Sequence, residues 1–104
     1  MADIHVERTH TLGLAPARQL AQRWAERAEE KLGVTCTYEE PADGGLVLFE
    51  RPGIEGRMRV DATTVVVDVE LGFLFSAFQG RIEGDIAEKL DSLLARASAA
   101  GATP

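Results

Sequence analysis

The sequence has few of the residues that would allow disulfide cross-links or binding to polyanions. Cys36 is the single cysteine among 104 residues, so no disulfide can form within the chain. It lies in an alternating, strand-like segment, so we expect it to act as a small buried apolar residue. A single cysteine also fits a protein of a reducing compartment. The formal net charge is −6, and the 11 lysines and arginines are dispersed among 17 carboxylates. This charge makes binding to nucleic acid unfavourable.

Long hydrophobic runs are also missing. The first ten residues lack the apolar core of a signal peptide. The longest uncharged stretch, residues 71–80, is about half as long as a membrane-spanning helix requires. We therefore expect a soluble, cytoplasmic protein without a membrane-spanning segment.

Sequence signatures of catalysis are absent as well. The chain contains neither a glycine-rich phosphate loop nor a serine nucleophile elbow. His5 and His10 have opposite parity on the first predicted strand and lack the spacing of a metal-binding pair. We predict no enzymatic activity, no cofactor and no metal, and a structural hydrogen bond for His10 at the strand end. A ladder of solvated charges, rather than an acid/base site, is predicted for Arg57, Arg59, Asp68 and Glu70.

The periodicity of apolar residues predicts a protein of the α+β class. Strands are expected over 3–10, 34–39, 46–51, 57–60 and 64–73, and amphipathic helices over 15–32 and from about 78 or 79 to 97. The order β-α-β-β-β-β-α predicts an antiparallel sheet with both helices packed on one face. One domain would span residues 1–97, followed by a flexible tail over 98–104. Ala15 is expected at the N-cap of the first helix, with Pro16 as the first helical residue.

Turns and glycines give further expectations. Residues 52–56 are predicted to form a turn, and a second turn near Ala62 and Thr63 allows two registers in the last hairpin. One register pairs Val60 with Val65, and the other pairs Val60 with Val67. Glycines at positions 80 and 84 suggest close approach of a neighbouring backbone, and an Asp85–Lys89 ion pair is expected on the same helix.

The segment that joins the last strand to the last helix carries more apolar residues than a core pattern uses. Phe73 and Phe75 share the parity of the buried valines before them, so we predict that both pack in the core. Leu74 has the opposite parity, and Phe78 falls in the turn before the helix. Apolar side chains exposed there would mark a contact site.

Two motifs give the chain a family resemblance. The opening R-x-H-x-L-G-L (residues 8–14) and the block E-L-G-x-L-x-x-x-F-x-G-x-I-E (residues 70–83) resemble the polyhydroxyalkanoic acid system protein family. The resemblance covers roughly residues 3–95. It implies a setting in bacterial storage-polyester synthesis and granules, and it implies no catalytic residue. Ala15 and Gly84 depart from the family pattern.

These observations lead to two functional hypotheses. The first is a non-catalytic protein of the polyhydroxyalkanoate system that binds a granule surface, a granule protein or itself as a homodimer, through Leu74, Phe75 and Phe78. The alternative is a binder of a small acyl or hydroxyacid ligand in a cavity between the sheet and the C-terminal helix. His10 or Tyr38 would then be the polar handle.

Overall fold

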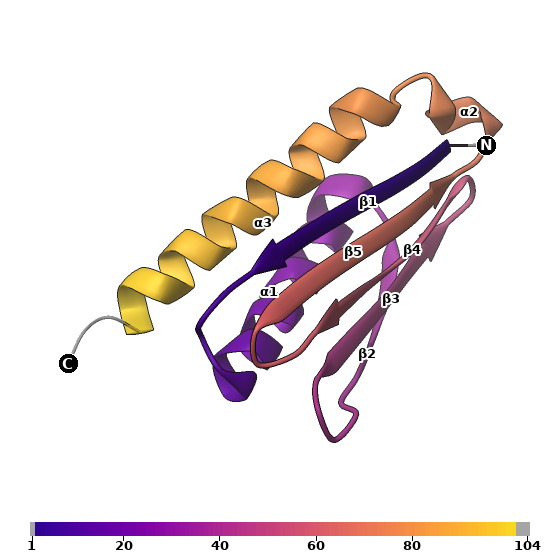
Figure 1. Cartoon of the computed structure of the whole chain (residues 1–104). Coiled ribbons are helices and arrows are strands. Elements are labelled where there is room, and N and C mark those ends of the chain that lie inside the picture. The colour runs from indigo at the N-terminus through magenta and orange to yellow at the C-terminus, as the bar shows by residue number, and fades with distance from the viewer. Residues whose placement is uncertain (1, 102–104) are drawn as a thin grey trace.

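The chain folds into an antiparallel sheet with helices on one face (Figure 1). The computed structural model describes residues 2–101. Its strands are β1 (Ala2–Thr9), β2 (Thr35–Glu39), β3 (Gly45–Arg51), β4 (Ile54–Val60) and β5 (Thr64–Leu71). Its helices are α1 (Leu14–Leu32), α2 (Phe73–Ser76) and α3 (Gln79–Gly101). The α+β class and the order β-α-β-β-β-β-α are confirmed, with α2 as an additional short helix.

The five strands lie in the order β1-β5-β4-β3-β2, and each neighbouring pair is antiparallel. In the last hairpin Val60 pairs with Val65, so the first of the two predicted registers is the one adopted. Asp61 explains this choice, because its carboxylate accepts the backbone N–H groups of Thr63 (2.8 Å) and Thr64 (2.7 Å). These hydrogen bonds hold the pKa of Asp61 below its usual value.

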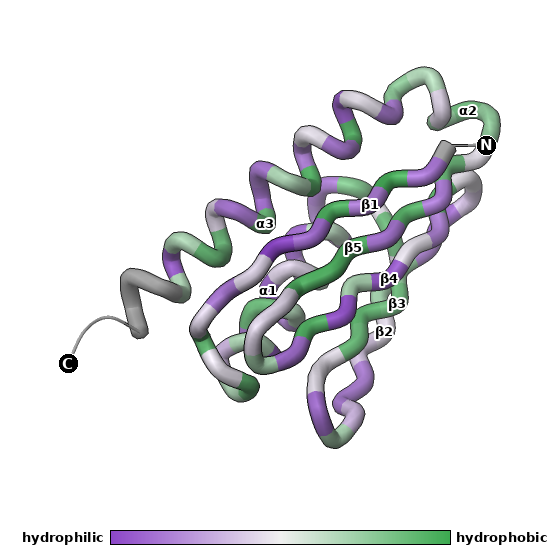
Figure 2. The backbone as a smooth tube through the Cα atoms, in the orientation of Figure 1, coloured by the Kyte–Doolittle hydropathy of each residue, from purple (hydrophilic) through white to green (hydrophobic). Residues whose placement is uncertain are grey.

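Hydrophobic and hydrophilic residues alternate along the strands (Figure 2), and in β5 burial alternates with them, so the sheet has one buried and one solvated face. Strand residues of one parity meet the apolar stripes of α1 and α3. Trp24 of α1 packs on Phe49 of β3, with ring centroids 4.9 Å apart in a tilted arrangement. The core members that are 0% exposed are Ala17, Ala21, Val47, Met58, Val65, Val67, Leu71 and Leu90.

The predicted turn over residues 52–56 is shorter than expected. Its last three residues, Ile54 to Gly56, belong to β4, and Gly56 pairs with Phe49. A Cβ atom at Gly56 would lie 2.5 Å from Cζ of Phe49 and 2.7 Å from the carbonyl oxygen of Asp68. Gly56 is therefore a strand glycine that makes room for a core aromatic ring, and its interpretation as a turn residue was wrong.

Both long helices differ slightly from their predicted limits. Helix α1 begins at Leu14 with Gly13 as its N-cap, so the prediction of Ala15 as N-cap was wrong. Pro16 is the third helical residue, still within the turn whose N–H groups lack helical partners. Helix α3 continues past the predicted end at Ala97 to Gly101, because the intervening alanines favour helix. Residues 102–104 of the predicted tail lie outside the described residues.

Helix α3 packs along the edge strand β1 and beside α1. At the β1 end, the Arg8 guanidinium donates to the Asp91 carboxylate through Nε at 2.8 Å. The close backbone approach expected at Gly80 and Gly84 was wrong, because a Cβ atom at either position would meet nothing within 4 Å.

Replacing Gly84 by alanine should therefore stabilise the protein. The change Gly84→Ala should raise the free energy of unfolding by about 0.5–1 kcal/mol, because alanine loses less backbone entropy in a helix. Gly56→Ala should lower it by roughly 1–3 kcal/mol, because its methyl group would overlap the Phe49 ring. Urea unfolding of the two variants measures both effects. A destabilised Gly84→Ala variant would show that α3 meets another backbone there.

Candidate functional site

Three of the four large apolar side chains that are exposed in the described residues lie on α2 or just after it, where the chain leaves the sheet. Strand β5 ends at Leu71, and the N–H of Gly72 donates to the carbonyl oxygen of Gly53 at 2.8 Å. A Cβ atom at Gly72 would lie only 3.2 Å from Cα of Gly53. The chain thus crosses the β3–β4 turn at close range and then forms α2 rather than continuing as a strand.

Phe75 is the side chain that fastens α2 to the sheet. Its ring lies against Gly53, where a Cβ atom would come within 2.7 Å of Cδ2. The Arg51 guanidinium lies 5.3 Å from the centroid of the same ring, in a cation–π arrangement. Arg51 also donates through Nη1 to the carbonyl oxygen of Leu32, at the end of α1, at 2.8 Å. One arginine therefore joins the end of α1 to the ring that anchors α2.

The start of α3 is fastened in the same region. The side-chain amide of Gln79 donates to the carbonyl oxygen of Asp3 in β1 at 2.8 Å. The N–H of Phe78 donates to the carbonyl oxygen of Phe75 at 2.9 Å, and the N–H of Ile82 donates to that of Phe78 at 2.9 Å. The segment between β5 and α3 is thus held at both ends.

Three large apolar side chains point outward from this fastened segment. Phe73 is 86% exposed, Leu74 78% and Phe78 56%. We call Phe73, Leu74 and Phe78 the α2 patch. The prediction of a buried Phe73 was wrong, because β5 ends before it and the strand parity no longer applies. Phe75, expected in the core, is half-buried at its edge.

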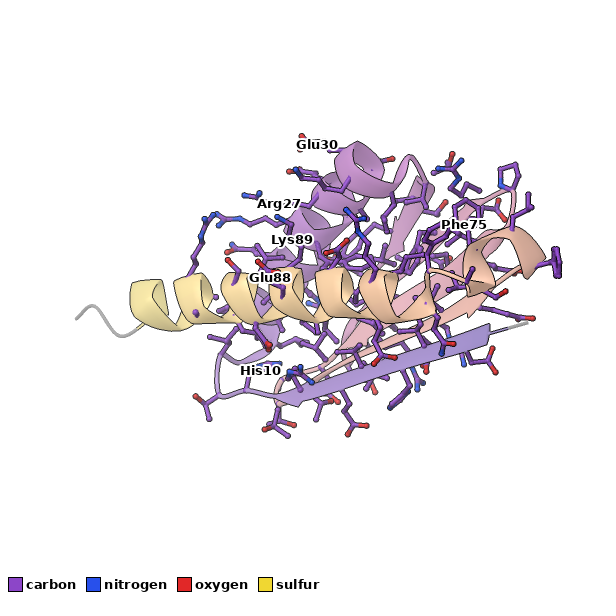
Figure 3. The ribbon with its side chains drawn as sticks, turned by 90° about the horizontal axis from the view of Figure 1, so that it is seen from above. His10, Arg27, Glu30, Phe75, Glu88 and Lys89 are labelled. Carbon is purple, nitrogen blue, oxygen red and sulfur yellow. The ribbon has the colours of Figure 1, made fainter. Side chains whose placement is uncertain are left out.

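The expected contact residues thus have two different environments. Leu74 and Phe78 are exposed, as a contact role requires. Phe75 (labelled in Figure 3) is directed toward the sheet, and its contact with Gly53 holds the segment that bears the other two. The surplus of apolar residues in the sequence pointed to Leu74 and Phe78. Phe73 was missed because its parity matches that of the buried valines.

The two suggested polar handles lie far apart in the sheet. His10 follows β1 and Tyr38 belongs to β2, and these strands form opposite edges. The Leu12 N–H donates to Nδ1 of His10 at 3.1 Å, which confirms the structural hydrogen bond predicted at the strand end. The Tyr38 hydroxyl donates to Glu40 at 3.2 Å. A single small ligand therefore cannot contact both side chains.

The solvated sheet face carries a histidine–carboxylate pair. Nδ1 of His5 lies 2.6 Å from Oδ1 of Asp68, and Nε2 lies 3.3 Å from the Glu7 carboxylate. These hydrogen bonds, Asp68 first, raise the pKa of His5. Asp68 faces Arg57 across the hairpin, but its carboxylate contacts His5. Both side chains are exposed, and the Asp68 carboxylate stabilises the protonated form of His5 on the solvated face of the sheet.

Within residues 2–101, no group of three or more histidine, cysteine, aspartate or glutamate side chains is arranged to hold a metal ion. The helices that can be described there are all too short or too polar to cross a bilayer. The surface chemistry that stands out is the α2 patch.

These features define a small α+β protein with exposed apolar side chains on a segment held beside the β3–β4 turn. The chain belongs to the polyhydroxyalkanoic acid system protein family: the family model described as "Putative polyhydroxyalkanoic acid system protein" matches residues 4–94. The resemblance seen in the two sequence motifs is thereby confirmed. No curated protein matches the chain.

Cys36 lies on the sheet face that α1 covers. Its thiol donates to the carbonyl oxygen of Ala25 at 3.5 Å. Burial, with a smaller effect of the Glu29 carboxylate, raises the pKa of this thiol to about 11. A thiol with so high a pKa is a weak nucleophile at neutral pH.

Cys36 should therefore react slowly with thiol reagents in the folded protein. At a pH near the ordinary thiol pKa of about 8.5, labelling should be roughly a hundredfold slower than in urea, because little thiolate is present. The rate of reaction with a chromogenic disulfide measures this difference. Equal rates in buffer and in urea would show that Cys36 is accessible and reactive.

Proposed function

We propose that this chain is a non-catalytic protein of the polyhydroxyalkanoate system that binds the granule surface through the α2 patch. The observation that supports this function is the exposure of three large apolar side chains on one fastened segment. Single exposed apolar residues are ordinary on protein surfaces, but a contiguous group marks a contact site. A storage polyester offers an apolar surface of matching chemistry.

The energetics of such a contact are favourable. Complete burial of a leucine or phenylalanine side chain is worth about 1.5–3 kcal/mol. Partial burial of Phe73, Leu74 and Phe78 would thus supply a few kcal/mol. Phe75 and the hydrogen bonds of Gly72 and Gln79 already order the segment, so binding loses little conformational entropy. The acidic charge elsewhere keeps the unbound protein dispersed in water.

The size of the α2 patch favours a granule surface over a second copy of the chain. An aromatic side chain buries about 150–250 Å². Because the three side chains are 56–86% exposed, those of one copy offer roughly 300–550 Å², which is less than the roughly 600 Å² per partner that a stable protein interface buries. Adsorption to an extended polymer surface has no such minimum, because many molecules bind side by side.

Partition between purified granules and buffer tests this function. The double variant Leu74→Asp/Phe78→Asp should lose at least about tenfold in bound fraction, because two charges would have to enter an apolar contact. The matched control Leu48→Asp/Ala95→Asp adds the same two charges at exposed positions on β3 and α3. It should bind as the wild type does.

Two companion measurements separate the other partners. Particles of pure polyester should bind the wild type as granules do, whereas binding that needs granule proteins would disappear on them. Sedimentation of the free protein measures its molar mass. A homodimer formed through the α2 patch would have twice the mass of the chain in the wild type, and a lower mass in Leu74→Asp/Phe78→Asp. Equal partition of the folded double variant and the wild type would overturn the surface-patch function.

A further inference from the structure

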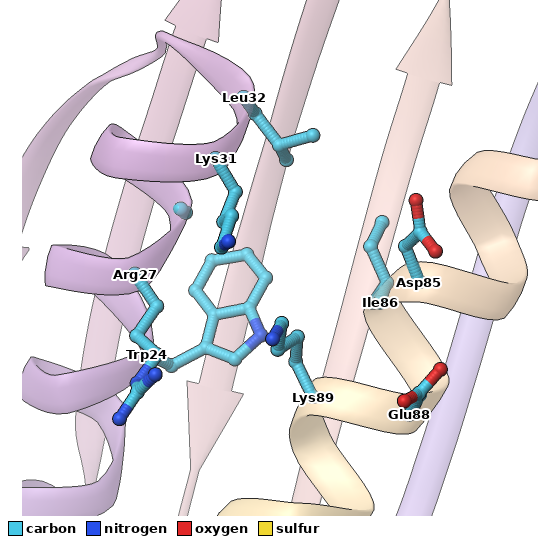
Figure 4. Close-up of a pocket in the computed structure, with 9 residues that line it drawn as sticks. Trp24, Arg27, Lys31, Leu32, Asp85, Ile86, Glu88 and Lys89 are labelled. Carbon is cyan, nitrogen blue, oxygen red and sulfur yellow. The ribbon is translucent and has the colours of Figure 1, made fainter.

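A second surface feature lies between the two long helices, away from the α2 patch. A groove of about 300 Å³ separates α1 from α3 (Figure 4). Nine side chains line what we call the α1–α3 groove: Trp24, Arg27, Ala28, Lys31 and Leu32 from α1, and Asp85, Ile86, Glu88 and Lys89 from α3. Its volume is at the lower end of the range found for small-molecule sites.

The base of the groove is apolar. Trp24, Ala28 and Ile86 are buried members of the core, and Leu32 packs against them. Trp24 is the only tryptophan of the chain. A ligand that enters the groove would therefore place its apolar part against the edge of the core, beside the single indole.

The rim of the groove carries an excess of positive charge. Arg27 and Lys31 come from α1 and Lys89 from α3 (Figure 4), and these lysines are the only two in the sequence. Among the described residues, none of the three cations forms an ion pair. The predicted Asp85–Lys89 pair is not formed, so that prediction was wrong.

The carboxylates of the groove do not cancel this charge. Asp85 and Glu88 are exposed, as is Lys31, whereas Arg27 and Lys89 are half-buried. In Figure 4 the Lys31 and Lys89 side chains extend from the two helices toward Trp24, and Asp85 and Glu88 also line the groove. The cations exceed the carboxylates by one charge, which favours a singly charged anionic group.

We propose that the α1–α3 groove binds an anionic amphiphile, namely a monocarboxylate with an apolar chain of medium length. The chain lies along Trp24 and Ile86, and the carboxylate accepts hydrogen bonds from Lys31 and Lys89. A protein with net charge −6 can hold an anion where cations without ion pairs gather, and in this groove three cations line one cavity without an ion pair among the described residues. The site shares no residue with the α2 patch.

Fluorescence of Trp24 is the direct test, since this single indole lines the groove. Octanoate, titrated below its micelle concentration, should change the emission saturably. Octanol, which has the chain without the charge, should bind several-fold more weakly, and acetate, which has the charge without the chain, should give no change. The lysine amines can also be methylated with ¹³C-labelled methyl groups and observed by NMR. Octanoate should shift the resonances of both Lys31 and Lys89.

Variants distinguish the groove from nonspecific adsorption. Lys31→Gln/Lys89→Gln should weaken octanoate binding about tenfold and leave octanol binding unchanged, because two charge-assisted hydrogen bonds are lost. Arg23→Gln, at an exposed position of α1 outside the groove, should bind octanoate as the wild type does. Far-UV circular dichroism verifies that both variants are folded.

The outcomes separate this site from the granule-binding function. Leu74→Asp/Phe78→Asp should retain full octanoate affinity, and Lys31→Gln/Lys89→Gln should retain granule partition. The proposal would be overturned if octanoate bound the wild type no more tightly than octanol does. It would also be overturned if Lys31→Gln/Lys89→Gln bound octanoate as tightly as the wild type does. Octanoate binding that the α2 patch variant abolishes would overturn it as well.

Discussion

The contact between Phe75 and Gly53 determines where the apolar surface of this protein lies. The ring occupies space that a side chain at position 53 would fill, and Gly72 approaches the same turn from the other side. Gly53 also adopts a positive φ of 87°, a conformation that side chains other than glycine's rarely allow. Two glycines and one phenylalanine thus bring the end of β5 against the β3–β4 turn.

This contact separates one side chain that anchors from three that are free. With Phe75 directed toward the sheet, Phe73, Leu74 and Phe78 remain outside. Arg51 extends the constraint to α1, because the same guanidinium lies over the Phe75 ring and caps the carbonyl oxygen of Leu32. The patch is therefore ordered before any partner arrives, which limits the entropy lost on binding.

The parts of the fold that could be predicted are those with a strong repeat. The valines of β5 alternate regularly, and the stripes of α1 and α3 recur every three to four residues, so the class, element order and buried faces follow from the sequence. The end of β5 could not be predicted, because Phe73 and Phe75 continue the alternation of apolar residues in the sequence beyond the last residue of the strand. What stops the strand is a hydrogen bond from Gly72 to a turn about twenty residues earlier in the chain. Sequence periodicity contains no information about such a contact.

The candidate sites show the same division. Leu74 and Phe78 were identifiable as apolar residues in excess of the core pattern, whereas Phe73 became visible only once the strand end was known. The α1–α3 groove was not predicted either. Its cations lie on two different helices, and Lys31 and Lys89 are 58 positions apart in the chain. Their lack of ion pairs within the described chain depends on side-chain placement. Helical spacing alone predicts a pair of Lys89 with Asp85, which the structure does not contain.

The location of the contact surface is the central claim, and hydrogen–deuterium exchange of the wild-type chain tests it most directly. Exchange is compared for the free protein and for protein bound to particles of pure polyester. Binding through the α2 patch should slow exchange at residues 72–79 and leave the solvated face of β3 and β4 unchanged. Protection spread over that sheet face, or no added protection at residues 72–79, would contradict the account.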